Sequence, residues 1–348
     1  MKAKQAIDTA SLPLVNVVMP IRNEAPHIRQ CLEAVLAQDY PADRLDVVVA
    51  DGMSDDGTRE IISGYVQGYP NLRLLDNPQR IVPTALNVGI RVAQGDIIVR
   101  VDGHTTLAPD YVRECVAALE RTGADNVGGR MDAQARGYFG KAVALATSSP
   151  FGVGNARFHY SSKEEWVDTV YMGAYRREVF EHIGLFDEEL VRDQDDEFNY
   201  RLRAHGGRIL LCPQIRSQYT NRSSPRKLWR QYFEYGYWKV RVLQKHPRQM
   251  RWRQFVPPVF VAALLGALGL SALGIFWPLA LIAGSYLVTN LAATLWTAGR
   301  SGLQYLAVLP VVFLILHVSW GVGFLSGLLR FANRWRDRAT NRVASAGV

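Results

Sequence analysis

The chain of 348 residues has little cysteine: Cys31, Cys115 and Cys212 stand far apart, without the paired spacing of a disulfide framework or a zinc site. We therefore expect free thiols and a reducing compartment. The N-terminus carries two lysines followed by polar residues and lacks the apolar stretch of a signal peptide. No Gly-x-Gly-x-x-Gly motif follows the first apolar run, which argues against a dinucleotide-binding oxidoreductase.

Charge is nearly absent from residues 255–329, where Arg300 and His317 are the only basic or acidic side chains. The first part of this stretch, 255–296, has no charged residue over 42 positions. It is too long for one crossing of a hydrocarbon layer of about 30 Å, and Pro278 divides it into two spans. A soluble bundle of buried helices is the alternative, but core helices rarely lack charge over such a length.

A third apolar span, 303–329, completes a predicted membrane region at 254–330 with about three hydrophobic helices. Basic residues flank this region on both sides. The segment 216–253 has eleven Lys and Arg against one acidic residue, Glu234, and the tail 331–348 is also basic. The positive-inside tendency places both flanks in the cytoplasm, which requires an even number of crossings. Either the tail breaks this rule or one of the three segments lies in the interface.

Residues 1–215 show alternating strand and helix patterns, which predict a doubly wound α/β sheet with parallel strands. Apolar runs and helical spacing place the first elements as follows: strands at 15–18, 45–50, 72–75 and 97–101, and helices at 27–38, from about 58, and at 83–93. The alternation loosens after residue 121. There we expect strands at 126–130, 167–171 and 209–211 and helices at 177–182 and 195–205. This second half, 122–215, is expected to recognise an acceptor.

Asp102-Gly103-His104 directly follows the buried-strand pattern of residues 97–101. Open α/β sheets bind ligands at the carboxyl ends of their strands. An Asp-x-His pair at that edge can hold Mg²⁺ or Mn²⁺ against a nucleotide diphosphate, and the imidazole favours Mn²⁺. The alternative is a simple turn, because Asp and Gly commonly end strands.

Several further motifs have the order and spacing of one family. They are Val18-Met19-Pro20-Ile21-Arg22-Asn23-Glu24, the stretch Asp51–Thr58, Asn87-Val88-Gly89, Asp102-Gly103-His104, Tyr171–Glu178, Ile183–Asp187 and Gln194–Leu202. Together they resemble the family 2 glycosyltransferases with the GT-A fold, with a donor half at about 14–121. The Asp-x-His form, the Asp51–Ser54 turn and the apolar tail are most similar to the membrane-associated glucosyltransferases of succinoglycan-type exopolysaccharide assembly.

The resemblance implies a role for individual residues. It assigns donor binding to Pro20, Arg22, Glu24, Asp51 and Asp102. Asp51 would accept a hydrogen bond from the uracil ring, and Asp102 with His104 would bind the divalent metal, Mn²⁺ or Mg²⁺, on the diphosphate. The structural alternatives are a turn residue for Asp51 and a first-turn helix charge for Glu24.

Asp195 is the candidate general base. An inverting transferase needs a carboxylate that takes the proton of the acceptor hydroxyl as that oxygen attacks the sugar. In the family pattern a glutamate usually precedes this base, whereas this chain has Gln194. The neighbouring acidic residues, Asp196 in particular, are also typical of a solvated helix start.

The basic and aromatic segment 216–253 supplies candidate contacts to the diphosphate or the acceptor. These are Arg222, Arg230 and Tyr232, together with Arg201 of the preceding half. The alternative is an interfacial helix with an aromatic belt and snorkelling cations that faces anionic headgroups. No nucleic-acid-binding signature accompanies the basic charge, so we expect no nucleic acid partner.

The sequence thus predicts a membrane-anchored, metal-dependent, inverting glycosyltransferase. It would move a hexose, glucose by resemblance, from a UDP-sugar to a lipid-diphosphate-linked saccharide. We expect a multi-pass protein of a bacterial inner membrane with a cytoplasmic catalytic domain, working beside other polysaccharide-assembly proteins. A processive polysaccharide synthase is the nearest alternative, but the Gln-x-x-Arg-Trp motif is missing and three spans are few for a channel. A non-catalytic membrane protein that retains a nucleotide-sugar-binding fold is the other.

Overall fold

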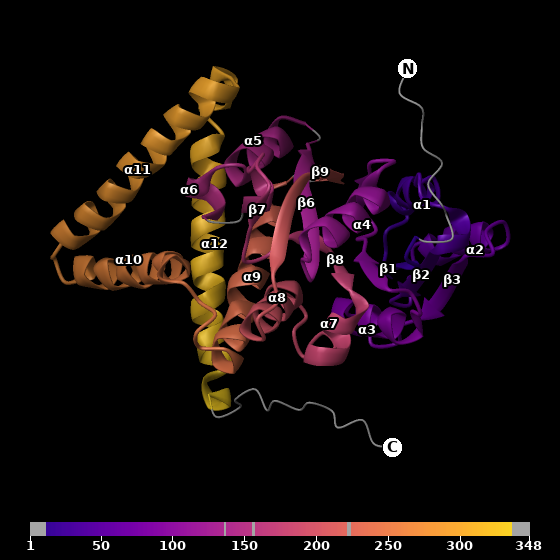
Figure 1. Ribbon diagram of the computed structural model, residues 1–348. Helices are drawn as coiled ribbons and strands as arrows, with labels where there is room; N and C mark the ends of the chain where they lie inside the picture. The colour runs from indigo at the N-terminus through magenta and orange to yellow at the C-terminus, as the bar shows by residue number, and fades with distance from the viewer. Residues whose placement is uncertain (1–11, 136, 155–156, 221–223, 336–348) are drawn as a thin grey trace.

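The computed structural model describes residues 12–135, 137–154, 157–220 and 224–335 (Figure 1). The strands are β1 Val15–Ile21, β2 Leu45–Asp51, β3 Leu72–Asp76, β4 Ile97–Arg100, β5 Thr105–Leu107, β6 Asn126–Gln134, β7 Glu165–Trp166, β8 Tyr171–Arg176 and β9 Ile209–Thr220. The α-helices are α1 Ile28–Leu36, α2 Thr58–Val66, α3 Val82–Val92, α4 Tyr111–Thr122, α5 Gly137–Thr147, α6 Pro150–Val153, α7 Arg177–Ile183, α8 Gln194–Ala204, α9 Pro225–Lys245, α10 Val256–Ala272, α11 Trp277–Ser301 and α12 Leu309–Arg330.

The strands form one sheet in the order β3-β2-β1-β4-β8-β6-β9-β5, with β7 paired to β9. Strands β3, β2, β1 and β4 are parallel, which confirms the predicted alternation for the first half. Beyond β4 the sheet is mixed, because β8 runs antiparallel to both β4 and β6. This mixed part of the sheet corresponds to the region after residue 121, where the predicted alternation loosens. Apolar runs identify buried strands but not their direction, so the sequence pattern could not reveal this change.

Two boundaries differ from the predicted ones. Strand β1 continues through Pro20 to Ile21, where Ile21 is level with Asp51 of β2. The strand predicted at 167–171 instead begins at Tyr171, after the short β7 has ended at Trp166. In between, the backbone N–H of Val167 still bonds to the carbonyl of Ile209. The apolar residues of 167–170 thus lie between two strands rather than in one.

Buried apolar side chains cover both faces of the sheet. One cluster joins β1, β2 and β4 to α1, α2 and α4, and includes Val17, Val47 and Leu32. The other joins Val18 and Ile98 to α3, α7 and α8. Burial on both faces explains why the parallel strands have nearly continuous apolar runs.

The three predicted membrane segments are helices long and apolar enough to cross a membrane: Trp252–Ala272, Trp277–Ser301 and Leu309–Arg330. In Figure 1, α10 and α11 extend away from the body of the protein, whereas α12 runs beside it. Helix α12 packs along α9, which carries most of the basic and aromatic segment.

Candidate active site

A cavity of about 1720 Å³ lies at the carboxyl ends of the parallel strands. At one end it is lined by Pro20, Arg22 and the residues after β4, and in its middle by the residues that begin α8. Its other end is lined by residues of α9 and of the three apolar helices. The cavity therefore includes residues from both sides of the expected domain boundary at 215.

Asp102 and His104 line the cavity directly after β4. Asp102 accepts two hydrogen bonds from the guanidinium of Arg100, at 2.9 and 3.3 Å. The Nδ1 of His104 lies 3.1 Å from Oε1 of Glu24, which must be the acceptor. Gly103 between them allows this approach, because a Cβ there would lie 2.5 Å from Ile21 and 3.1 Å from Glu24.

The arrangement of these side chains fits a divalent metal that the nucleotide helps to bind. A carboxylate holds the Nδ1–H of His104 and leaves Nε2 as a lone-pair donor, which is the usual support of a metal-binding histidine. No cluster of three or more His, Cys, Asp or Glu that could hold a metal occurs in the described part of the chain. A site with few protein ligands still suits Mg²⁺ or Mn²⁺ that is also bound by substrate phosphates. Glu24, expected in the nucleoside pocket, lines the cavity but contacts this histidine.

Pro20 and Arg22, which are expected in the nucleoside pocket, line the cavity. The stem of Arg22 packs against Gly52, where a Cβ would be 3.1 Å away, and its Nη1 donates to the carbonyl of Arg80. Asp51 does not line the cavity. Its side chain is fully buried and accepts from the N–H and hydroxyl of Ser54, at 3.0 and 2.6 Å, and from Arg59 at 3.1 Å. Asp51 therefore orders the loop after β2, and contact with a base requires that loop to move.

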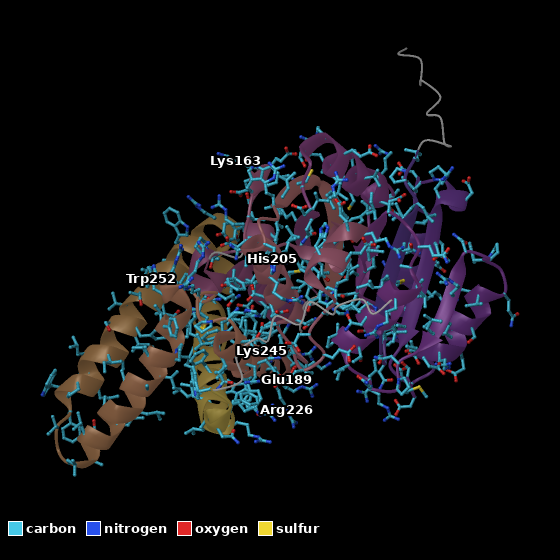
Figure 2. The ribbon with its side chains drawn as sticks, turned by 60° about the horizontal axis from the view of Figure 1, so that its bottom comes forward. Lys163, Glu189, His205, Arg226, Lys245 and Trp252 are labelled. Carbon is cyan, nitrogen blue, oxygen red and sulfur yellow. The ribbon has the colours of Figure 1, made fainter. Side chains whose placement is uncertain are left out.

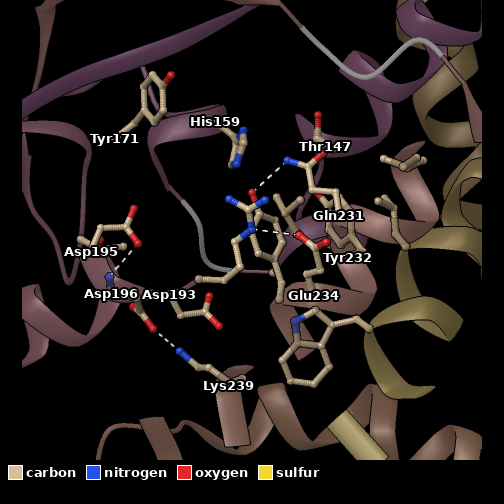
Figure 3. A pocket seen from close by; sticks show the side chains of 18 of the residues that line it. Thr147, His159, Tyr171, Asp193, Asp195, Asp196, Gln231, Tyr232, Glu234 and Lys239 are labelled. Carbon is tan, nitrogen blue, oxygen red and sulfur yellow. Dashed lines mark hydrogen bonds and ion pairs between the residues drawn. The ribbon is translucent and has the colours of Figure 1, made fainter. Parts of the chain in front are cut away.

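Asp195 lies in the first turn of α8 and lines the middle of the cavity (Figure 3). Its Oδ1 accepts from the N–H of Asp196 at 2.9 Å, and its Oδ2 is 3.9 Å from Nη1 of Arg100. Burial raises the pKa of Asp195 above the usual range for aspartate, while Arg100 opposes the rise and Asp196 adds to it. A carboxylate whose pKa is raised but still limited by a cation is suited to general base catalysis.

Asp196 is not the solvated helix-start charge that the sequence suggested. It forms an ion pair with Lys239 of α9, a lysine that is almost completely buried, and accepts a hydrogen bond from Gln249. Burial alone would lower the pKa of Lys239, but Asp196 and then Asp193 outweigh it and raise the pKa. Figure 3 shows this pair beside Asp195 and Asp193.

Asp193 precedes α8 in the left-handed conformation, with φ of 59°. Burial raises the pKa of Asp193 well above the usual range for aspartate, and Lys239 opposes this rise. Its Oδ2 is buried and has no hydrogen-bond partner among the described residues. Sequence reasoning assigned no role in the site to Arg100, Lys239 or Asp193. The available signals were one cation inside an apolar strand for Arg100 and the acidic cluster itself for Asp193.

The candidate acceptor contacts separate into three groups. Arg230 and Tyr232 line the cavity, Arg230 with a side chain that is 80% exposed. Arg201 does not line it: its guanidinium bonds to Glu197 and to the carbonyls of Ile183 and Leu185, so it stabilises the packing of α7 on α8. An acceptor role for Arg201 is therefore incompatible with its position. Arg222 lies outside the described residues.

Several cations of the basic segment face the catalytic half rather than headgroups. In α9, Lys239 pairs with Asp196 and Arg241 with Glu189. Lys245 also pairs with Glu189, and Figure 2 shows these two residues close together. Headgroup binding was the wrong expectation for these cations. Arg226 and Lys227, which line the cavity, have no acidic partner within the described ranges and could accept phosphate.

The end of the cavity that lies between the apolar helices has apolar walls and one set of hydrogen-bonded polar groups. Phe260 and Trp320 line it from α10 and α12. Tyr286 of α11 stacks on Phe260, and its hydroxyl lies 3.0 Å from Nδ1 of His317. The Nε2 of His317 lies 2.8 Å from the carbonyl of Phe151. Both ring nitrogens of His317 thus have partners, one on α11 and one on α6.

Comparisons with known proteins agree with this geometry. The family model described as "Glycosyl transferase family 2" matches residues 16–184. The succinoglycan biosynthesis protein ExoA of Rhizobium meliloti is 31% identical over 340 residues, covering 96% of this chain and 99% of that protein. A dolichyl N-acetyl-α-D-glucosaminyl phosphate 3-β-D-2,3-diacetamido-2,3-dideoxy-β-D-glucuronosyltransferase of Methanococcus voltae is 26% identical, covering 91% of this chain and 97% of that protein. The structure of the mannosyltransferase PcManGT from Pyrobaculum calidifontis, in complex with GDP-Man and Mn²⁺, has a TM-score of 0.60 at 22% identity, covering 93% and 89% of the two chains.

Proposed function

Because the chain belongs to glycosyltransferase family 2, we propose that it transfers a hexose from a UDP-sugar to a lipid-diphosphate-linked saccharide, with inversion at the sugar carbon. The similarity to ExoA over nearly the full length supports a role in exopolysaccharide or related glycan synthesis. We propose glucose as the transferred sugar on the resemblance of the sequence motifs alone. One cavity lined by Arg22, Asp195 and residues of the apolar helices supports a donor site, a base and an acceptor entrance that are close together.

The extent of this cavity is the observation that supports a lipid-linked acceptor. It reaches from the donor end past Asp195 to Phe260, Ile282 and Trp320 of the apolar helices. A soluble sugar acceptor would not need an apolar route that ends between membrane helices. An amphiphilic acceptor would place its lipid there, its phosphates near Arg226 and Arg230, and its sugar hydroxyl at Asp195.

In the proposed reaction Asp195 removes the proton of the acceptor hydroxyl as that oxygen bonds to C1 of the donor sugar. The bond from C1 to the diphosphate breaks on the opposite side and UDP leaves, so one displacement inverts the centre. Arg100 supports both ends of this step, because it contacts Asp102 and lies near Asp195. Asp102 and His104 would hold the divalent metal, which supplies charge stabilisation to the leaving diphosphate.

We further propose that the catalytic half lies on the cytoplasmic side of a bacterial inner membrane. The basic flanks of the apolar region support this orientation. A membrane location also brings the base to an acceptor that cannot leave the bilayer. Other polysaccharide-assembly proteins would then supply the acceptor and consume the product.

UDP release by the detergent-solubilised full chain tests the proposal. UDP-glucose and UDP-galactose are compared, with Mn²⁺ present or chelated, and with a membrane lipid extract as the acceptor source. We expect metal-dependent release that requires the extract and adds one sugar per acceptor. Long products would instead indicate a processive synthase, and absence of UDP binding would support a non-catalytic protein.

Asp195→Asn separates chemistry from binding in the same assay. The variant should lose transfer by at least about 10²-fold while it binds UDP as the unchanged chain does in calorimetry. Asp125→Asn, a change at a half-buried aspartate whose side chain accepts from the backbone N–H of Arg208, is the matched control and should remain active. Full activity of Asp195→Asn would remove Asp195 as the base.

A further inference from the structure

The two ends of the apolar region lie on the same side of the protein. Before α10, Nη2 of Arg251 contacts Oδ2 of Asp168 at 2.5 Å. After α12, Nη1 of Arg334 contacts Oε1 of Glu189 at 2.8 Å. Asp168 and Glu189 both belong to the catalytic half. A chain that leaves this half and returns to it crosses a membrane an even number of times, although three helices are apolar enough to cross.

Helix α12 lies along α9 in the same direction and at close range. A Cβ on Gly236 would lie 2.0 Å from the carbonyl of Trp320, and one on Gly323 would lie 2.1 Å from the carbonyl of Phe233. Further along, Gln244 donates to the carbonyl of Phe331. These contacts run from the middle of both helices to their ends, so α9 and α12 share one depth relative to any membrane surface.

Helix α9 cannot occupy the hydrocarbon layer. It is 21 residues long, about 31 Å, with exposed Arg226 and Arg230 near one end and Lys245 at the other. Its middle holds Glu234, which pairs with Arg192. If α12 crossed the bilayer, these charges and the acidic residues of the catalytic half that pair with α9 would enter the membrane, at a cost that proteins rarely accept.

The hairpin of α10 and α11 is apolar and largely exposed, in contrast to the charged α9. In the most apolar stretch of each helix, only 17% of α10 and 11% of α11 is buried within the protein. The corresponding share for α12 is 44%. Large apolar side chains are exposed along both helices, among them Val259, Leu265, Leu281, Leu287 and Val288. A helix that is apolar all round and leaves most of its length uncovered by protein is stable in lipid. The spans of 21 and 25 residues are about 31 and 37 Å long, enough for a crossing.

The exposed part of α12 forms a single stripe. Three exposed apolar residues, Val311, Leu314 and Leu329, lie on one helical face. The half-buried residues between them on the same face are Val318, Val322 and Leu325. The other face packs on α9, α5 and α6. An element with one protein face and one apolar outer face suits the boundary between headgroups and acyl chains.

We propose that only α10 and α11 cross the membrane, and that α12 lies in the interface on the catalytic side, with its outer stripe in contact with lipid. Two crossings place both basic flanks on one side, which satisfies the positive-inside tendency that three crossings would violate. The membrane end of the cavity then opens between a crossing hairpin and an interfacial helix, at the level where a lipid headgroup lies.

Labelling of single introduced cysteines tests the topology without any assay of activity. The three native cysteines are buried and free, so the unchanged chain serves as the background. The sites are Gln67→Cys in the catalytic half, Leu273→Cys at the exposed turn of the hairpin and Asn333→Cys after α12. A membrane-impermeant maleimide is applied separately to sealed inside-out and right-side-out vesicles. Labelling after addition of detergent is the control that each thiol can react.

We expect Gln67→Cys and Asn333→Cys to be labelled from the same side and Leu273→Cys from the other. Labelling of Asn333→Cys from the side opposite to Gln67→Cys would establish three crossings and overturn the proposal. Labelling of all three from one side would show that the hairpin does not cross, which also overturns it.

Depth measurements on α12 test its interfacial position. Spin labels at Leu314, Val318 and Leu325 are compared by their collision rates with oxygen and with a polar nickel complex. We expect one shallow depth for all three labels. A maximum of depth at Val318, flanked by shallower positions, would indicate a helix that spans the bilayer.

Discussion

The guanidinium of Arg100 connects the candidate metal site to the candidate base: it bonds to both carboxylate oxygens of Asp102, and its Nη1 lies 3.9 Å from Oδ2 of Asp195. Arg100 itself is nearly buried, and it keeps its charge because, although burial opposes protonation, Asp102 and Asp195 raise its pKa further above the usual value. One fixed cation thus stabilises negative charge at two places that the proposed reaction uses. Its position is set by the end of β4.

Replacing Arg100 should change the pH dependence of the reaction. In Arg100→Met, Asp195 loses the cation that limits its pKa, so the pKa rises and the base is protonated up to a higher pH. We expect the acid limb of kcat/KM to move upward by about one pH unit or more. A pH profile of UDP release measures this, with Arg113→Met, a surface cation paired to Asp39, as the control. An unmoved acid limb would contradict the assignment of Asp195 as the titrating base.

Glu24 should act through His104. In Glu24→Gln the carboxylate that orients the imidazole and fixes its Nδ1–H is lost, and we expect the affinity for Mn²⁺ to fall by about 10- to 100-fold. The readout is the Mn²⁺ concentration that half-activates UDP release, together with UDP binding in the absence of metal. Glu33→Gln, which alters an exposed contact to Tyr65, is the control. If metal-free UDP binding falls instead, Glu24 belongs to the nucleoside pocket.

Lys239 and Asp196 should behave as a coupled pair. Lys239→Met leaves a partly buried carboxylate without its cation, and we expect a loss of about 3 kcal/mol in the free energy of unfolding. The unpaired negative charge of Asp196 beside Asp195 would also lower kcat, because it raises the pKa of the base. Adding Asp196→Asn removes the unpaired charge and should restore most of the stability, as should Lys239→Arg alone. Thermal unfolding and kcat are measured in parallel, and additive losses in the double variant would exclude the coupling.

Two glycine-to-alanine changes should have opposite effects on stability. Gly64 lies in α2, where an added Cβ would meet no atom within 4 Å, so Gly64→Ala should stabilise the chain by up to about 1 kcal/mol through helix propensity. At Gly236 the same change meets the backbone of Trp320 at 2.0 Å and must separate α9 from α12. We expect a lower unfolding temperature for Gly236→Ala in detergent. Equal effects at both sites would mean that the helices are not in close contact.

The sequence predicted what is local in the chain. Asp102-Gly103-His104 follows a clear apolar strand, and Asp195 lies in a recognisable acidic motif, so both could be placed before the fold was known. Asp51 was found by its motif, yet the donors that occupy its oxygens, Ser54 and Arg59, could not be inferred from residue type.

What the sequence could not predict depends on distant contacts. Lys239 pairs with a residue 43 positions earlier, and its neighbours in the chain suggested only an interfacial helix. The strand order beyond β4 is set by packing rather than by apolar pattern, since parallel and antiparallel strands can have the same burial. Likewise, an even number of membrane crossings could be inferred only from the positions of Arg251 and Arg334 in the fold.

The position of α9 means that the chain does not divide into an enzyme and an anchor. One face of α9 is fixed to α12 by glycine contacts, and its cations hold Glu189 and Asp196, which flank the loop that presents Asp195. A fragment that ends near residue 215 would lose the end of β9 that pairs with β5 directly after His104, together with the wall that α9 forms beside Asp196. Such a fragment should turn over poorly, because residues on both sides of position 215 shape one cavity.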